Sequence, residues 1–173
     1  MTKKIILHRY HTPHGVAGNL VLGSFGSQLC LCDWDNGSGT SSSEKRIEHA
    51  LKAEFVQGVS SVIENTVQQL DEYFARKRKT FNVPLYLVGT EFQKKVWMSL
   101  AGIPYGRTIS YADEAAMLNI PKAVRAVANA NGANPVSIIL PCHRVIGRNG
   151  SLTGYGGGLD TKQFLIELEA GNT

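Results

Sequence analysis

The chain has 173 residues, of which 43% are hydrophobic and 18% charged, a composition typical of a soluble globular protein with one medium domain or two small ones. No apolar run approaches the ~18 residues of a membrane-spanning helix, and the apolar stretch near the amino terminus is too short for a signal peptide. The net charge of +4 is modest, and three cysteines without a secretion signal favour free thiols in a reducing cytoplasm.

The first part of the chain is typical of a strand meander. Three strand-like segments alternate with turn residues and are expected at residues 5–10, 18–25 and 28–34. A loop rich in Gly, Ser and Thr follows, and apolar residues near helical spacing then predict helices over 44–54 and 59–78. The sequence therefore predicts an antiparallel three-stranded sheet followed by two helices.

The second of these helices ends in four cations, Arg76 to Lys79. Because cations stabilise the negative end of a helix dipole, we interpret them as a solvated helix end rather than as a DNA contact. Residues 82–89 contain Pro84 and predict a linker. The linker divides the chain into an amino-terminal domain, residues 1–85, and a carboxy-terminal domain, residues 86–173.

The carboxy-terminal half carries clear helix starts. Thr90 and Gln93 have the spacing of a capping box, and Ser110 is placed to cap a helix over 111–118. Pro121 suits the first position of the next helix. Two short helices joined by a tight turn predict a helix-turn-helix.

The outer face of the second short helix suits a close approach to a polyanion. Lys122, Arg125 and Asn129 lie three and four residues apart, so they share that face. The other side chains expected there, Ala126 and Ala130, are small. This face is therefore a candidate nucleic-acid contact.

A candidate nucleophile lies in the stretch 115–159, which holds four basic residues and no Asp or Glu. The segment Pro141-Cys142-His143-Arg144-Val145 follows the apolar run 136–140, which predicts a buried strand. A neighbouring imidazole and positive surroundings favour a thiolate. The alternative is a core cysteine, because successive strand side chains point to opposite faces. Cys142 and its histidine neighbour can cooperate only if the strand ends before Pro141.

Taken together, these motifs resemble the O6-alkylguanine-DNA alkyltransferases, or methylated-DNA–protein-cysteine methyltransferases. The resemblance extends from Gly89 to Glu169. It implies an α+β fold with a ribonuclease H-like amino-terminal α/β domain and a mostly helical, winged-helix-like carboxy-terminal domain. The segments that carry it are GTEFQ (89–93), IPYGRTISY (103–111), PKAVRAV (121–127), PCHRV (141–145) and GYGGGL (154–159).

The resemblance implies that Cys142 accepts the alkyl group of O6-alkylguanine, and of O4-alkylthymine, in one irreversible step that consumes the protein. No metal or cofactor is implied. His143 takes the thiol proton through a water, Glu169 orients the imidazole, and Tyr111 donates a proton to the guanine. Asn134 braces the turn before the cysteine. The substrate pocket is expected to include Val145, Tyr155, Gly156 and Gly157.

The partner implied by the resemblance is double-stranded DNA, bound by a cytoplasmic monomer through the minor groove with little sequence specificity. Cooperative assembly on DNA stays open. The target base must be flipped out of the duplex, and Arg125 fills its place, flanked by Lys122, Ala126, Asn129 and Ala130. Gly156 stands where many members of the family carry Ser, so we expect a roomier pocket with backbone donors only.

Other readings fit parts of the sequence. A non-reactive lesion binder would lack the acceptor thiol that Cys142 supplies, and a Cys–His hydrolase would leave the outer helix face unexplained. A methylation-sensing regulator needs a domain with four zinc-binding cysteines, whereas the chain has three cysteines. A zinc site of His8, His11, Cys30 and Cys32 is conceivable, but two cysteines on one face of a strand favour core packing.

Overall fold

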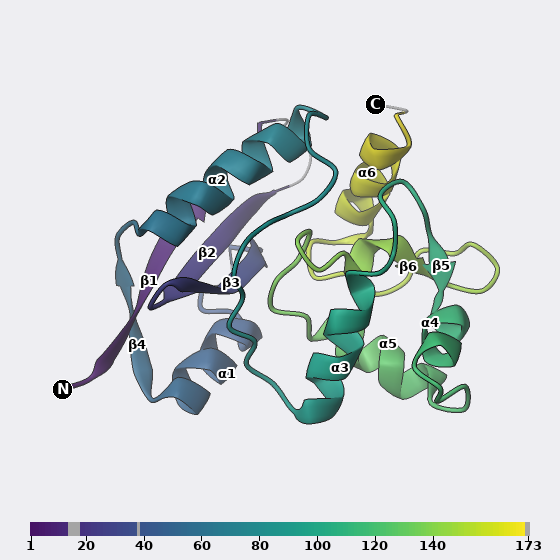
Figure 1. Cartoon of the computed structure of the whole chain (residues 1–173), viewed down its shortest axis with the longest axis horizontal. Coiled ribbons are helices and arrows are strands. Elements are labelled where there is room, and N and C mark those ends of the chain that lie inside the picture. Colours follow the sequence, from purple (N-terminus) through teal and green to yellow (C-terminus); the bar gives the residue numbers. More distant parts are fainter. Residues whose placement is uncertain (14–17, 38, 172–173) are drawn as a thin grey trace.

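The computed structural model describes residues 1–13, 18–37 and 39–171. An amino-terminal sheet domain lies beside a carboxy-terminal helical domain, and a long connection passes from the first to the second (Figure 1). In the described part of the chain, no helix is long and apolar enough to cross a membrane.

The amino-terminal domain is built on a mixed sheet of four strands in the order β3-β2-β1-β4. Strands β1, β2 and β3 pair antiparallel, as predicted, whereas β4 pairs parallel with β1. The prediction of a three-stranded, purely antiparallel sheet is therefore wrong. The strands are β1 (Lys3–Tyr10), β2 (Asn19–Phe25), β3 (Gln28–Asp35) and β4 (Ala53–Gln57).

The missed strand lies where the sequence predicts the end of a helix. Helix α1 (Ser42–Leu51) begins after the N-cap Ser41 and ends at Lys52, whose φ of 50° is left-handed. The chain then runs back along β1, with Ala53 opposite Lys3. Parallel pairing through a helical crossover is a non-local contact, so the local pattern did not reveal it.

Helices α1 and α2 (Ser61–Phe74) cover opposite faces of the sheet. Leu20 and Leu22 of β2 pack in the cluster that includes α2, whereas Val21 packs in the cluster that includes Ile47 of α1. A register shift between β2 and β3 leaves Cys30 as an extra residue, so Cys30 and Cys32 fall in different clusters. The expectation that these cysteines share one face is wrong.

The carboxy-terminal domain consists of short helices around the cysteine segment. Capping boxes at Thr90–Gln93 and Ser110–Asp113 start α3 and α4, and α4 and α5 form the predicted helix-turn-helix with α3 packed against α5. Pro121 lies in the turn before α5 rather than in its first position. The elements are α3 (Glu91–Leu100), β5 (Ile109–Ser110), α4 (Tyr111–Met117), α5 (Val124–Gly132), η1 (Cys142–Arg144), β6 (Val145–Ile146) and α6 (Leu159–Ala170).

The apolar run 136–140 is not a strand. It is joined to the edge of β3 by a single bridge, in which Ser137 N–H donates to the Cys32 carbonyl at 2.7 Å. The chain then turns at Ile138, whose φ is 68°. The run is apolar because it is buried between the two domains, and an apolar run alone does not distinguish a strand from another buried segment.

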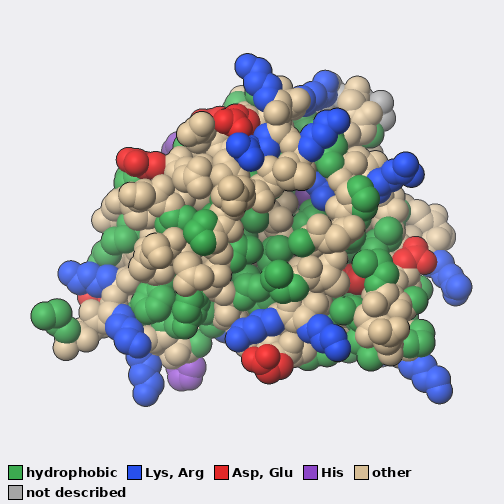
Figure 2. Space-filling view, viewed as in Figure 1, with side chains coloured by type: hydrophobic (Ala, Val, Ile, Leu, Met, Phe, Trp, Pro, Cys, Tyr) green, Lys and Arg blue, Asp and Glu red, His purple; other side chains and the backbone are tan. Residues whose placement is uncertain are grey.

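The surface shows how the charges are distributed over one face. In the view of Figure 2, Lys and Arg side chains stand mainly around the edge, and hydrophobic and uncharged side chains form the middle. Helix α2 ends at Phe74 with no basic residue in its last turn, so the expectation that Arg76 to Lys79 form the helix end is wrong. Beyond the helix, Arg78 pairs with Glu72 at 2.7 Å, and Lys77 and Lys79 are exposed.

Candidate active site

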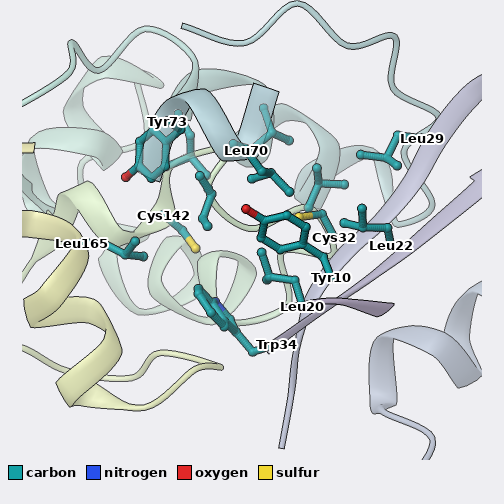
Figure 3. Close-up of a cluster of buried hydrophobic side chains, with 14 of the residues drawn as sticks. Tyr10, Leu20, Leu22, Leu29, Cys32, Trp34, Leu70, Tyr73, Cys142 and Leu165 are labelled. Atoms are coloured by element: carbon teal, nitrogen blue, oxygen red, sulfur yellow. The ribbon is translucent and has the colours of Figure 1, made fainter. Parts of the chain in front are cut away.

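Cys142 is the first residue of the 3₁₀ turn η1. Its side chain belongs to a cluster that spans both domains, and Figure 3 shows it between Trp34 of β3 and Leu165 of α6. Because Cys142 and His143 lie on a helical turn, the alternation of a strand does not force their side chains to opposite faces. The turn after Pro141 therefore removes the main objection to a cooperating pair.

The environment of the Cys142 thiol favours the neutral form at rest. Burial raises its pKa to about 11, although a hydrogen bond with Asn134 and the charge of Lys162 act in the opposite direction. The charge of Lys162 favours the thiolate, as expected of positive surroundings, but desolvation outweighs it. The thiol needs a base to become a nucleophile.

His143 is placed as that base. It is fully buried, and burial lowers the pKa of its imidazole, which favours the neutral ring despite the nearby Glu169. Its Nε2 lies 2.9 Å from Glu169 Oε1, so a neutral imidazole donates there and leaves Nδ1 as an acceptor. Nδ1 has no hydrogen-bond partner among the described residues.

Glu169, on α6, is held by more donors than the sequence indicated. Arg144 binds both carboxylate oxygens, at 2.7 Å from Nη2 to Oε1 and 3.0 Å from Nε to Oε2, and the Tyr73 hydroxyl donates to Oε1 at 3.1 Å. Burial alone would raise the pKa of Glu169, but hydrogen bonds from His143 and Arg144 and the charge of Arg144 lower it to about 2. The carboxylate therefore stays ionised beside the imidazole.

Two of these donors were missed or misplaced by sequence reasoning. Arg144 is one of the four basic residues of the stretch 115–159, but it is buried and paired with Glu169, and its Nη1 donates to the Ile103 carbonyl at 2.6 Å. Tyr73 comes from α2 of the other domain. A helical tyrosine on an apolar face gives no local signal that it reaches a carboxylate 96 residues away.

Asn134 and Tyr111 line the same cavity as Cys142. Asn134 Nδ2 donates to the Leu140 carbonyl at 2.8 Å, and its Oδ1 accepts from Val136 N–H at 2.9 Å, so it closes the turn that leads to the cysteine. The hydroxyl of Tyr111 lies 3.4 Å from Nζ of Lys162, a lysine that is fully buried.

Cys142 opens into a cavity of about 340 Å³ whose walls come from both domains. Gly156 and Tyr155 line it as expected, and Trp34 Nε1 donates to the Tyr155 hydroxyl at 3.0 Å. Val145, in contrast, is buried in β6 and is not among the lining residues. Gly157 also lies outside the lining, and a Cβ atom there would meet the Trp34 ring at 2.8 Å.

The outer face of α5 is exposed at all but one of the expected positions. Arg125, Ala126 and Asn129 are exposed on the helix, and Lys122 is exposed just before it. Ala130 is only 3% exposed, because it packs with Val96 and Val127 against α3. The expectation that Ala130 lies on the outer face is therefore wrong. Ala130 follows the core residue Val127 by three positions, so the two side chains share the buried face of the helix.

The alternative zinc site is not supported. Within residues 1–13, 18–37 and 39–171, no three His, Cys, Asp or Glu side chains gather in a way that could hold a metal ion. Cys30 and Cys32 are both fully buried, and burial raises the pKa of both thiols.

Known proteins resemble the chain over both domains. A model of the "6-O-methylguanine DNA methyltransferase, DNA binding domain" matches residues 91–171, and one of the "ribonuclease-like domain" of the same protein matches residues 8–87. A methylated-DNA–protein-cysteine methyltransferase of Methanosarcina barkeri is 46% identical over 75% of this chain and 80% of its own length. The chain belongs to the methylated-DNA–protein-cysteine methyltransferase family.

Other similarities within this family differ in their extent. The Methanosarcina mazei protein of that name is 57% identical over 60% of this chain, and the alignment spans 66% of that relative, slightly less than two thirds of its length. The crystal structure of Mycobacterium tuberculosis OGT in complex with DNA matches at a TM-score of 0.79 with 37% identity, covering 98% of this chain and 94% of that one.

Proposed function

We propose that this protein repairs alkylated DNA directly, by moving the alkyl group from O6-alkylguanine to Cys142 in a single use of each molecule. The observation that carries the proposal is the buried thiol beside a neutral imidazole whose other nitrogen is tied to an ionised carboxylate. This is the nucleophile, base and orienting group of an activated-nucleophile site. Family membership supports the same reaction.

The reaction forms one S–C bond and breaks one C–O bond. The thiol proton of Cys142 passes through a water to Nδ1 of His143, and the sulfur attacks the alkyl carbon. The electron pair of the C–O6 bond leaves with the guanine, which takes a proton from the hydroxyl of Tyr111. The proton on His143 later returns to Tyr111 through solvent, so the products are neutral guanine and a thioether.

Four further residues support this reaction. Glu169 holds the His143 ring and stabilises the imidazolium, and Arg144 keeps that carboxylate ionised and fixed. Asn134 braces the turn and hydrogen-bonds the thiol. Lys162, 3.4 Å from the Tyr111 oxygen, stabilises the phenolate that forms when this tyrosine gives up its proton.

The partner we propose is double-stranded DNA, entered through the minor groove by α5. The M. tuberculosis relative in complex with DNA supports DNA as a partner. The exposed Arg125 occupies the position of the flipped base, and the neighbouring Ala126 allows a close approach of the helix. We further propose binding by a monomer in the cytoplasm, with the domain boundary at residues 85 and 86.

A transfer experiment tests the proposal. The protein is incubated with a duplex carrying one O6-methylguanine, digested, and its peptides weighed. One methyl group is expected on the peptide that contains Cys142, and none is expected in the Cys142→Ser variant. Methyl found only on Cys30 or Cys32, or on no cysteine, would overturn the proposal.

A further inference from the structure

The cavity at Cys142 receives an acidic side chain from the amino-terminal domain. Asp33, on β3, is one of its lining residues, and the Trp34 N–H donates to Asp33 Oδ1 at 2.9 Å. A Cβ atom on Gly156 would lie 3.8 Å from that same oxygen. The carboxylate therefore borders the segment at Gly156, in the cavity that also holds Cys142 and Tyr111.

Asp33 gives this cavity its charge. Of the described residues that line it, Asp33 alone carries a formal charge at neutral pH. Two cations lie outside the lining: Lys162 contacts Tyr111, and Nη2 of Arg46 donates to the Ala133 carbonyl at 2.8 Å. Burial raises the pKa of Asp33, whereas hydrogen bonds from Trp34 and Ser43 and the charge of Arg46 act in the opposite direction and favour the carboxylate. The negative charge of Asp33 also raises the pKa of the Cys142 thiol, so its field reaches the sulfur.

An alkyl group in transit must lie between the guanine oxygen and the sulfur, and therefore inside this cavity. A negative charge on that group would share the cavity with Asp33, in surroundings where water screens charges poorly. A neutral group of the same shape would meet no such repulsion. Discrimination by an unfavourable contact of this kind is a common source of specificity.

We propose that Asp33 is a specificity-determining residue that disfavours anionic alkyl groups, such as carboxymethyl, relative to neutral groups of the same size. The inference rests on the proposed alkyl transfer for its biological meaning. Its physical content, a carboxylate in the cavity that holds the acceptor sulfur, is independent of DNA and can be measured without it.

Two alkylating reagents of nearly equal size measure the charge at Cys142. Iodoacetate is anionic and iodoacetamide is neutral; with each, an S–C bond forms, iodide leaves with the electron pair of the C–I bond, and the thiol proton goes to the buffer. The rate of alkylation of Cys142 is measured at pH 8 from the peptide that contains it. The rate with iodoacetate is divided by the rate with iodoacetamide, and this ratio is compared with the same ratio for free glutathione. This normalisation removes the intrinsic difference between the reagents.

The ratio is expected to be well below that of glutathione in the natural protein and to rise about tenfold in Asp33→Asn, the size expected for one unit charge at short range. Asp33→Glu should keep the low ratio. Asp35→Asn is the matched control, since Asp35 lies on the same strand but pairs with Arg9 at 3.2 Å and does not line the cavity. An unchanged ratio in Asp33→Asn, or an equal rise in Asp35→Asn, would overturn the proposal.

A second measurement covers the case in which Asp33→Asn does not fold. In the natural protein, the ratio should rise with salt concentration, because salt screens the repulsion; a ratio independent of salt and equal to that of glutathione contradicts the proposal. Duplexes with O6-carboxymethylguanine and O6-carbamoylmethylguanine then separate the two claims. If no alkyl group is transferred from either duplex or from an O6-methylguanine duplex, the proposed function is refuted. If the carboxymethyl and carbamoylmethyl groups are transferred at equal rates, the role of Asp33 is refuted.

Discussion

Replacing Glu169 with Gln should lower both stability and the rate of alkyl transfer. The carboxylate is almost fully buried and accepts hydrogen bonds from His143, Arg144 and Tyr73. Gln has the same shape but no charge, so the buried guanidinium of Arg144 loses its counter-ion. Removing one partner of a buried ion pair costs about 3–5 kcal/mol.

The pKa of Glu169 gives a second estimate. It falls from an ordinary 4.5 to about 2, a difference of about 2.5. At ~1.36 kcal/mol for each pH unit, the ionised carboxylate contributes about 3 kcal/mol to the free energy of unfolding at neutral pH. Because the folded pKa is the lower one, this contribution is present above pH 4.5 and is lost as the pH falls toward 2.

Urea unfolding of the natural protein and Glu169→Gln at pH 7 and at several values between pH 5 and 3 tests this reasoning. The difference in unfolding free energy should be about 3 kcal/mol at pH 7 and should shrink as the pH falls. Glu72→Gln is the control, because Glu72 makes a partly exposed ion pair with Arg78 at the surface and should contribute little. Equal stability of Glu169→Gln and the natural protein at pH 7 would refute the reasoning, as would a difference independent of pH.

Three further predictions concern the chemistry and the DNA surface. Arg125→Ala should slow repair of duplex DNA far more than transfer from free O6-benzylguanine, and equal losses would contradict its base-replacing role. Alkylation of Cys142 by iodoacetamide should be slow at pH 7 and should rise with pH toward about 11; a plateau below pH 8 would contradict the neutral resting thiol. Gly157→Ala should slow transfer of methyl and benzyl groups together, because its Cβ would displace Trp34 and the whole closing loop; loss of benzyl transfer alone would instead indicate simple steric exclusion.

Local patterns predicted much of the fold. The three antiparallel strands, the Thr90–Gln93 capping box, the Ser110 cap and the helix-turn-helix are each determined by a few neighbouring residues, and the structure confirms them. The predictions failed at β4, where the sequence predicts the end of a helix, and at the segment 136–140, where it predicts a strand, for a common reason. Both depend on pairing or burial between distant parts of the chain, and an apolar run does not reveal which distant surface covers it.

The candidate site was only partly within reach of the sequence. The sequence motif identified Cys142 and His143 as candidates. In the structure, the Glu169 carboxylate accepts a hydrogen bond from the imidazole of His143. Tyr73 and Asp33, however, come from the amino-terminal domain, and only the packing of the two domains brings them to the site. The resting state of the thiol also depends on burial, which residue types alone do not give.

The most direct test of the central claim is the stoichiometry of repair. A fixed amount of protein is mixed with a large excess of duplex carrying O6-methylguanine, and the restored guanine is counted over time. Repair is expected to stop when one guanine has been restored for each protein molecule, with every Cys142 converted to S-methylcysteine. Continued repair beyond that point, with Cys142 still a free thiol, would contradict the claim.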